Sequence, residues 1–381
     1  MKLYQLLLFI AVFVSLYGGM HLYVYRRLVI LLPGWHWLLA LLLCLLLLLP
    51  LLVEVLIHNG VIRIAAPMAW IGFSWMGVVF LLFSALLALD LYRGLASILH
   101  RFLPQLDGPW LLTAARGTLL ALLLALVVAL YGFFAARRVN LVQLELSSAK
   151  LNGSPRSIRI IQISDLHLGH FTDLSRLSRL VSRINALKPD LIVSTGDLID
   201  MALDPEDVIA DQLMGLQAPL GTYAVTGNHE AYAGLSQVNS FVRGIGFRML
   251  SGAGEQIGEF LSIAGVDDPA VTRQRATAVL PEQQLLQGLP PTRFTLLLKH
   301  QPVVDPTSRP LFDLQLSGHT HGGQIFPFNL LTRLFYRLPV GLTRLESESW
   351  VYVSRGTGTW GPPIRVLAPA ELTVIDLLPQ Q

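Results

Sequence analysis

The sequence predicts two unlike parts: an α-helical membrane domain with four spans, followed by an α/β domain in which mixed β-sheets are layered with helices. The first part is apolar and carries few charged residues. In the second part, short β-branched runs alternate with segments of helical periodicity, which is the pattern of layered α/β folds. We expect residues 1–138 to form the transmembrane domain, 139–156 a linker and 157–381 the α/β domain.

Four apolar stretches are long enough to cross a bilayer, which takes about 20 residues. The stretches are Leu3–Tyr25, Trp35–Ile57, Ala66–Leu89 and Leu111–Phe134. Buried core helices are the alternative, but runs of leucine such as Leu45–Leu49 favour contact with lipid. We therefore expect a multi-pass protein of the cell (inner) membrane.

Charged residues are unevenly distributed along the chain. Up to Ala136 there are seven Lys and Arg against three Asp and Glu, whereas the later residues are almost balanced. The basic surplus flanks the spans and forms no basic face, so nucleic-acid binding is not expected. Five basic residues flank the spans on one side and four on the other, which favours a cytoplasmic α/β domain by one residue. No charge lies in the middle of a span, which argues against a transport pathway.

The α/β pattern begins at Ile158–Ile163, a β-branched run that predicts a buried strand. Thr172 is placed to cap a helix that runs to about Leu187, and Leu191–Ser194 follows as the next strand. Asp204–Glu206 has the cap, proline and acid of a further helix start. Further strands are expected at Tyr223–Thr226, Phe260–Ala264, Phe294–Leu298, Leu314–Leu316, Trp350–Val353 and Leu372–Ile375.

Five of the loops that follow these strands carry histidine, aspartate or asparagine. In open α/β sheets, functional sites gather where the strands end. Five of the six histidines in the α/β domain lie in these loops, and we expect the sixth, His170, to be a surface residue. This concentration of histidine predicts a metal site. The loop residues are Asp165, His167, Asp197, Asp200, Asn228, His229, His300, His319 and His321.

Nitrogen and oxygen ligands of this kind suit divalent ions such as Mn²⁺, Zn²⁺ or Fe. Cys44, the only cysteine, lies in a predicted span, so cysteine ligands are excluded. On extended chain, residues two apart such as Asp165 and His167 point the same way. Two metals about 3.5–4 Å apart clamp a phosphate, generate hydroxide near neutral pH and stabilise the leaving oxygen. Asp197 is the candidate for the carboxylate that bridges them.

The motifs D-x-H, G-D-x-x-D, G-N-H-E, a lone His and G-H-T-H occur in this order over Ile158–Leu377. Together they resemble the calcineurin-like metallophosphoesterase superfamily. The strings S-D-L-H-L-G and G-H-T-H-G-G-Q, with Tyr352–Gly356, are similar to a bacterial subgroup that is often membrane-attached. Members of that subgroup are linked to phosphodiester, phospholipid or UDP-2,3-diacylglucosamine hydrolysis.

The resemblance implies a role for each loop residue. Asp165, His167, Asp197 and His321 would hold one metal, and Asp197, Asn228, His300 and His319 would hold the other. His229 would contact the phosphate and protonate the leaving group, and Asp200 would orient a ligand. Arg355 would either contact the phosphate or form a structural ion pair. Mn²⁺ is the first expectation for both ions, with Zn²⁺ or Fe as alternatives.

The function expected from the resemblance is a membrane-anchored two-metal phosphoesterase that acts on a phosphodiester or pyrophosphate bond of a lipid-linked or envelope substrate. The alternative is a membrane sensor or transporter that a phosphoesterase-like domain regulates. Turnover by the isolated domain, from residue 150 onward, would separate the two.

The segment Phe326–Leu338 follows the last motif and is unusually apolar, with arginines at 333 and 337. It is expected to be either a loop packed on the domain or an amphipathic, membrane-facing lid near the site.

Overall fold

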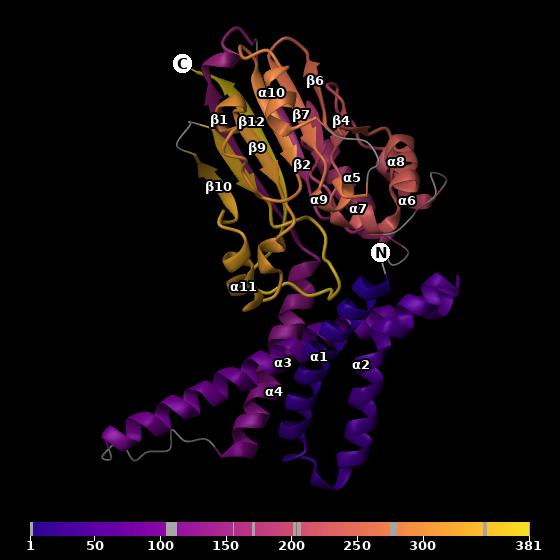
Figure 1. Ribbon diagram of the computed structural model, residues 1–381, viewed down its shortest axis with the longest axis vertical. Coiled ribbons are helices and arrows are strands. Elements are labelled where there is room, and N and C mark those ends of the chain that lie inside the picture. Colours follow the sequence, from indigo (N-terminus) through magenta and orange to yellow (C-terminus); the bar gives the residue numbers. More distant parts are fainter. Residues whose placement is uncertain are drawn as a thin grey trace. The chain divides into compact units, whose positions relative to one another are not determined.

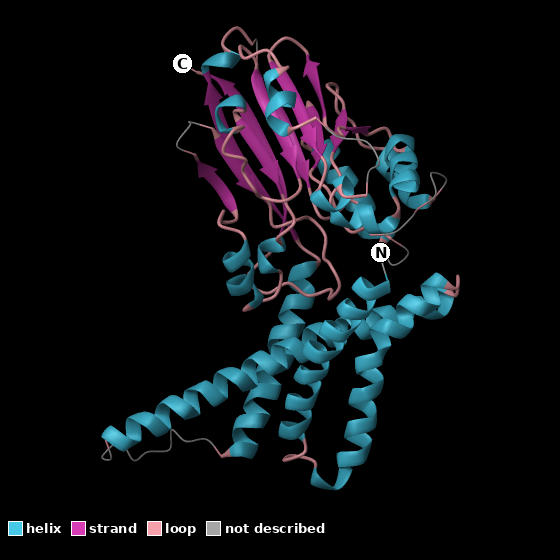
Figure 2. Cartoon of the chain, viewed as in Figure 1, coloured by secondary structure: helices cyan, strands magenta, loops and turns pink. Residues whose placement is uncertain are grey.

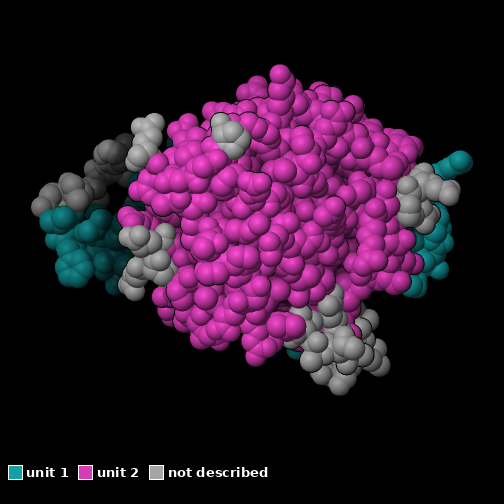
Figure 3. All heavy atoms as spheres, turned by 90° about the horizontal axis from the view of Figure 1, so that it is seen from above, with its two compact units in different colours: residues 1–134, 361–364 teal, residues 135–360, 365–381 magenta. Residues whose placement is uncertain are grey.

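The computed structural model describes the chain except for residues 1–2, 104–112, 155, 170–171, 201–202, 204–206, 275–279, 346–348 and 381, and except for the side chains of residues 3–7, 9 and 10. The chain forms two compact units, residues 1–134 with 361–364 and residues 135–360 with 365–381 (Figure 3). The expected surface residue His170 and the expected helix start at Asp204–Glu206 lie outside the described residues.

The first unit is helical. Its long helices are α1 (Leu3–Leu28), α2 (His36–His58), α3 (Ile62–Phe102) and α4 (Ala114–Ala136) (Figure 2). Among the described residues, three segments are long and apolar enough to cross a membrane: Pro33–His58, Ile62–Phe102 and Ala114–Ala136.

Among the described residues there are thus three such segments, whereas four spans were expected. The first predicted stretch does form a helix, α1, which has 26 residues. It is not among the three segments, and the side chains of residues 3–7, 9 and 10 are not among those described. Helix α3 has 41 residues and continues well past its expected end at Leu89. The helix ends at Phe102 because the next residue, Leu103, precedes Pro104, and helical backbone is disfavoured at the residue before a proline.

The second unit is a sandwich of two six-stranded mixed sheets (Figure 1). The first has the order β1-β12-β2-β3-β4-β5 and the second the order β10-β11-β9-β8-β7-β6. The strands of the first sheet are β1 (Val139–Ser148), β2 (Ile158–Ile163), β3 (Leu191–Ser194), β4 (Thr222–Ala224), β5 (Arg248–Met249) and β12 (Ala370–Pro379). The strands of the second are β6 (Ala253–Ile257), β7 (Leu261–Val266), β8 (Phe294–Lys299), β9 (Leu314–Ser317), β10 (Gly341–Arg344) and β11 (Trp350–Val353).

Helices cover the outer faces of both sheets. The helices on these faces are α5 (Leu174–Ala186), α6 (Val208–Met214), α8 (Leu235–Gly244) and α10 (Glu282–Gln287). The other helices of this unit are α7 (Asn228–Ala233), α9 (Pro269–Thr272) and α11 (Phe328–Phe335). The core between the sheets joins Ile160 and Val193 of the first sheet to Ile263 and Leu298 of the second. Apolar faces of α5, α6 and α8 pack on the outside of the first sheet, and α10 packs on the second. These layers confirm the predicted mixed sheets covered by helices.

The expected linker over 139–156 is wrong, because most of it is strand β1. This strand pairs in parallel with β12 along its whole length, from Val139 opposite Ala370 to Ser148 opposite Pro379. Leu144 and Leu146 pack into the core between the sheets, while Glu145 between them faces outward. The alternation of apolar and polar residues was the signal for a half-buried strand.

The helix expected from Thr172 is also corrected in detail. The residue that caps α5 is Asp173, whose carboxylate accepts a hydrogen bond from the Arg176 amide. Thr172 instead accepts a hydrogen bond from the Gly169 amide with its hydroxyl.

The position of β1 predicts where the α/β unit can be cut. A soluble domain that begins at Arg137 should be more stable than one that begins at Lys150, because loss of β1 uncovers Leu146, which is 6% exposed. Burial of one leucine is worth about 1.5–3 kcal/mol. A loss of about 2 kcal/mol lowers the Tm of a domain of this size by roughly 4–8 °C, which circular dichroism can measure. A domain that begins at Val139 is the control, since it keeps all of β1. Equal Tm values for all three would contradict this.

Candidate metal centre

The residues predicted to bind metal lie together at one end of the sandwich. Asp165, Asp197 and Asn228 follow the parallel strands β2, β3 and β4, and His300 and His319 follow β8 and β9. Because parallel strands end at the same edge of a sheet, the fold brings loops from both sheets to one place.

Left-handed backbone conformation marks this centre. Eight non-glycine residues of the described chain have positive φ, and five of these are expected ligands with φ between 48° and 71°: Asp165, His167, Asp197, His319 and His321. Each such residue costs roughly 1–2 kcal/mol relative to ordinary backbone. Strain of this kind collects at functional sites, where the surrounding structure holds it in place. The two D-x-H and H-x-H pairs are therefore not on extended chain, and the expected reason for their shared direction is wrong.

Two glycines make room for the ligands. A side chain at Gly227 would collide with the carboxylate of Asp197, and one at Gly318 would collide with Ser164 and Asp165. The turns that carry the ligands can therefore approach one another only where glycine stands.

The first group of side chains consists of Asp165, His167 and His321. The Nε2 atoms of His167 and His321 are 2.9 Å apart, and His321 Nε2 lies 3.6 Å from Asp165 Oδ1. All three residues are almost withdrawn from solvent. Their donor atoms face a common point, as ligands of one ion do.

The second group consists of Asp197, His300 and His319. His300 Nε2 lies 3.0 Å from His319 Nδ1 and 3.2 Å from Asp197 Oδ2. His300 donates its Nδ1 proton to the carbonyl of Thr195 at 2.8 Å, which leaves Nε2 free as a ligand. Asp197 Oδ2 is also 4.0 Å from His167 Nε2, so this carboxylate lies between the two groups as a bridging ligand would.

Asn228 supplies an independent test of whether a metal fits. Its side-chain oxygen is buried and has no hydrogen-bond partner among the described residues. A buried amide oxygen without a partner costs free energy unless another group takes its lone pairs. The oxygen belongs to a residue expected to bind the second metal, and the donor set around it is nitrogen and oxygen only. The residues present therefore fit two divalent ions.

The electrostatics of the centre favour a cation. Burial disfavours the charged form of His167, but the carboxylates of Asp200 and Asp197 outweigh it and raise the pKa of His167 to about 9. Burial and the neighbouring His300 lower the pKa of His319 to about 3. The carboxylates thus attract positive charge strongly, while His319 stays neutral and able to bind metal.

Asp200 connects the first group to His229. Its Oδ1 atom accepts a hydrogen bond from His167 Nδ1 at 2.5 Å and lies 2.9 Å from His229 Nδ1. Asp200 therefore fixes the ring of one expected ligand and the ring of the expected proton donor, in agreement with an orienting role. His229 also donates its backbone amide to Asp197 Oδ1 at 2.9 Å.

Arg355 forms an ion pair. Its guanidinium lies 2.6 Å from the buried carboxylate of Glu371, and its backbone amide donates to the same carboxylate at 3.0 Å. This contact favours the structural ion pair of the two expected roles. A contact between Arg355 and phosphate remains a prediction.

Sequence reasoning missed two residues that hold the loops. Glu230 is 1% exposed, and its carboxylate accepts hydrogen bonds from the amides of Gly227, Asp197, Leu198 and Ile199 at 2.7–3.2 Å. The G-N-H-E motif contained this glutamate, and its place at the third position of α7 was the available signal.

The second missed residue is Arg365, which is 1% exposed. It donates hydrogen bonds to the carbonyls of Arg355, Gly358 and Ala368 and lies 3.2 Å from His321 Nδ1. Nothing in the sequence distinguishes this arginine from a surface arginine.

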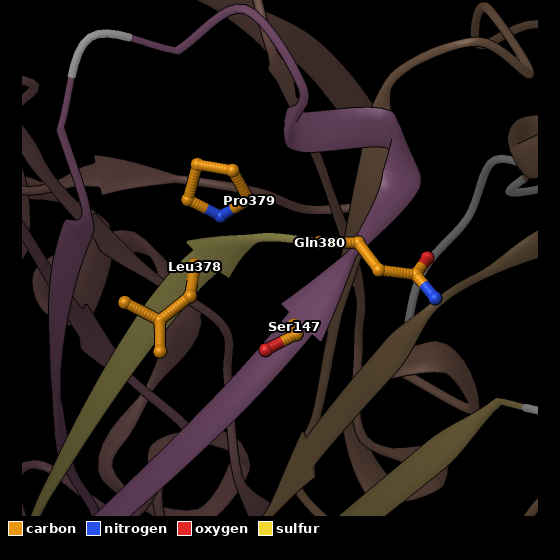
Figure 4. Close-up of a pocket in the computed structure, with 4 residues that line it drawn as sticks. All are labelled: Ser147, Leu378, Pro379 and Gln380. Carbon is orange, nitrogen blue, oxygen red and sulfur yellow. The ribbon is translucent and has the colours of Figure 1, made fainter.

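A pocket lined by Ser147, Leu378, Pro379 and Gln380 lies elsewhere (Figure 4). These residues end β1 and β12, and β12 is antiparallel to β2. The pocket is therefore at the opposite end of the sheet from the metal centre. Its lining offers no titratable side chain, so it contributes nothing to the chemistry.

Comparisons with known proteins find relatives that share the α/β unit. The family model described as calcineurin-like phosphoesterase matches residues 158–323. An uncharacterized metallophosphoesterase of Aquifex aeolicus is 38% identical over 221 residues, which cover 58% of this chain and 85% of that protein. A transmembrane protein with metallophosphoesterase domain from Danio rerio is 32% identical over 319 residues, which cover 81% of this chain and 73% of that protein. The second match is longer than the α/β unit, so it includes part of the helical unit.

The contacts of Glu230 generate a prediction. Glu230→Ala should weaken metal binding by about 10–100-fold although Glu230 touches no metal position, because the amides that hold the Asp197 loop lose their acceptor. Glu230→Gln, which keeps one acceptor oxygen, should lose less. Metal titration followed by calorimetry measures the affinity, and circular dichroism confirms that each variant is folded. A folded alanine variant with unchanged affinity would show that Glu230 does not position the loop.

Proposed function

Because the chain belongs to the calcineurin-like metallophosphoesterases, we propose that it is a membrane-anchored two-metal phosphoesterase that hydrolyses a phosphodiester or pyrophosphate bond of a lipid-linked substrate. The observation that carries the proposal is the pair of ligand groups, with Asp197 of the second group 4.0 Å from His167 of the first, together with the unpartnered oxygen of Asn228. Such a constellation has no use in a purely structural domain, since it buries charge at considerable cost.

The residues that would hold the ions are those of the two groups. Asp165, His167, Asp197 and His321 would hold one, and Asp197, Asn228, His300 and His319 the other. Two divalent ions, Mn²⁺ in our proposal, supply charge neutralisation for the phosphate and lower the pKa of water.

His229 is the proposed proton donor to the leaving group. Its Nδ1 atom lies against Asp200, so its Nε2 atom is the position from which a proton can pass to an alkoxide or phosphate oxygen. The side chain is 16% exposed and can therefore reach a substrate. Asp200 stabilises the protonated ring and keeps its orientation.

The surroundings of His229 support a substrate with groups on both sides of the scissile bond. The rings of Tyr232 and Trp360 lie 5.7 Å and 5.9 Å from its ring, and both side chains are more than half exposed. Exposed aromatic rings offer apolar contact area beyond the phosphate itself. Diesters and pyrophosphates carry a substituent that can use this area, whereas a small phosphate monoester gains little from it.

The proposed location is the inner membrane, with the catalytic unit on the cytoplasmic side. Arg137 and Arg138 directly follow α4, and basic residues at the end of a span favour the cytoplasmic side. Tethering favours a substrate that is itself in the membrane.

Metal removal tests the two-metal proposal. Hydrolysis of an aryl phosphodiester should be abolished by chelation and restored best by Mn²⁺, with Zn²⁺ or Co²⁺ as partial substitutes, because the ligands are nitrogen and oxygen. Release of the aryl alcohol gives the rate. Full activity after long dialysis against chelator would rule the proposal out.

Two substitutions separate metal binding from proton transfer. Asp197→Ala should lose metal and activity together, because this carboxylate serves both groups. His229→Ala should retain its metals and lose on the order of 10²–10⁴ in rate, the range for general acid catalysis. Metal content by mass spectrometry and turnover by phosphodiester hydrolysis are measured on the same samples. An equal loss of metal in both variants would refute the role of His229.

A further inference from the structure

Helix α11 has its polar and apolar faces reversed. Within α11 the partly buried residues are Asn329 and Thr332. Tyr336, which follows the helix, is partly buried as well, and the spacing of three and four residues puts all three on one face. Leu331, Leu334 and Phe335 are 48%, 77% and 81% exposed, and no residue of the helix is buried. A helix on the surface of a soluble domain normally turns its apolar stripe inward. The outer face of α11 therefore suits an apolar medium.

The inner side of α11 lies beside the metal centre. The hydroxyl of Tyr336 lies 2.6 Å from His319 Nε2, and the two rings meet edge to face with 5.2 Å between their centres. The backbone of Asn329 lies so close to Gly323 that a side chain at that glycine would collide with it. The helix is therefore held beside the last ligand motif, at the end of the domain where substrate must enter.

The charge around α11 is of one sign. Between Asp313 and Glu346 there is no acidic residue, whereas Arg333, Arg337 and Arg344 are present and exposed. Exposed apolar side chains together with basic residues fit the interface of a bilayer that contains anionic lipid.

Chain connectivity supplies a further argument. Helix α4 ends at Ala136 and β1 begins at Val139, so the two Cα atoms are at most about 11 Å apart. Val139 lies opposite Ala370, at the end of the sheet where antiparallel β2 finishes and Asp165 follows. The sheet is thus tethered to a predicted span at the same end that carries the metal centre.

We infer that α11 is an interfacial helix that inserts Leu331, Leu334 and Phe335 into an anionic phospholipid bilayer and presents lipid-linked substrate to the metal centre. The lipid-linked substrate in this inference rests on the proposed function. The contact with lipid rests on the exposed apolar face of α11, the basic residues around it and the short connection between α4 and β1.

Depth measurement tests the contact without relying on catalysis. The single cysteine allows a Cys44→Ser background in the full chain, into which Leu334→Cys carries a nitroxide label. Glu259→Cys is the control, because Glu259 is exposed and precedes β7, at the opposite end of the second sheet. In vesicles of phosphatidylethanolamine and phosphatidylglycerol, the label at 334 should be relaxed more by oxygen than by a water-soluble nickel chelate, and the label at 259 the reverse. Water-like accessibility at both positions would overturn the inference.

Activity supplies the second measurement. The triple substitution of Phe328, Leu331 and Phe335 by Ser should leave hydrolysis of a small soluble ester unchanged and slow that of a micellar lipid phosphoester about tenfold or more. The matched control replaces Val208, Met214 and Leu280, which are 50–54% exposed, by Ser and should change neither rate. If both rates of the α11 variant fall together, or neither falls, the helix does not present lipid. If the unmodified chain hydrolyses no ester, the proposed function fails, while the label still decides the contact with lipid.

Discussion

The metal centre depends on one buried carboxylate, Asp197, which lies between the two groups of histidines. Its Oδ2 atom lies 3.2 Å from His300 Nε2 and 4.0 Å from His167 Nε2, and its backbone amide donates a hydrogen bond to Glu230. Their surroundings shift the pKa values of these two acids in opposite directions. The positive charge of the nearby histidines outweighs burial and holds the pKa of Asp197 well below its usual range. Burial and the charge of Asp197 raise the pKa of Glu230 to about 7. Asp197 is thus kept anionic so that it can bind metal, whereas the carboxylate of Glu230 accepts hydrogen bonds from backbone amides.

The strained backbone of the ligand residues follows from the same arrangement. Loops from two sheets have to bring five left-handed residues to one point, and only a rigid surrounding structure can maintain this. The sandwich supplies the rigidity, because each loop leaves the end of a strand buried on both faces. Buried polar contacts then complete the support: Arg365 ties the loops that follow β11 to His321, and Glu371 neutralises Arg355.

The sequence predicted the centre of each sheet and missed the edges. Strands β2, β3, β8, β9 and β11 are buried runs, and each was recognised because apolar residues follow one another. The missed strands β1, β5, β6 and β10 are the four edge strands, where one side lacks a partner and polar residues intervene. At the centre, the residues that meet the expected metals were recognisable as motifs. Arg365 was not, because its importance comes from burial among carbonyl groups, and burial is a property of the fold.

The short connection between α4 and β1 has a consequence for how the enzyme finds its substrate. In the proposed function, a catalytic unit joined to a predicted span by two residues would encounter membrane-resident molecules in a thin layer, so their effective concentration would be high even when they are scarce. Tight binding of the head group then becomes unnecessary, and slow release of product would only reduce turnover. The partly exposed His229 agrees with such a site. It would capture a phosphate that lateral diffusion delivers repeatedly, and selectivity would come from the confinement as much as from contacts with the substrate.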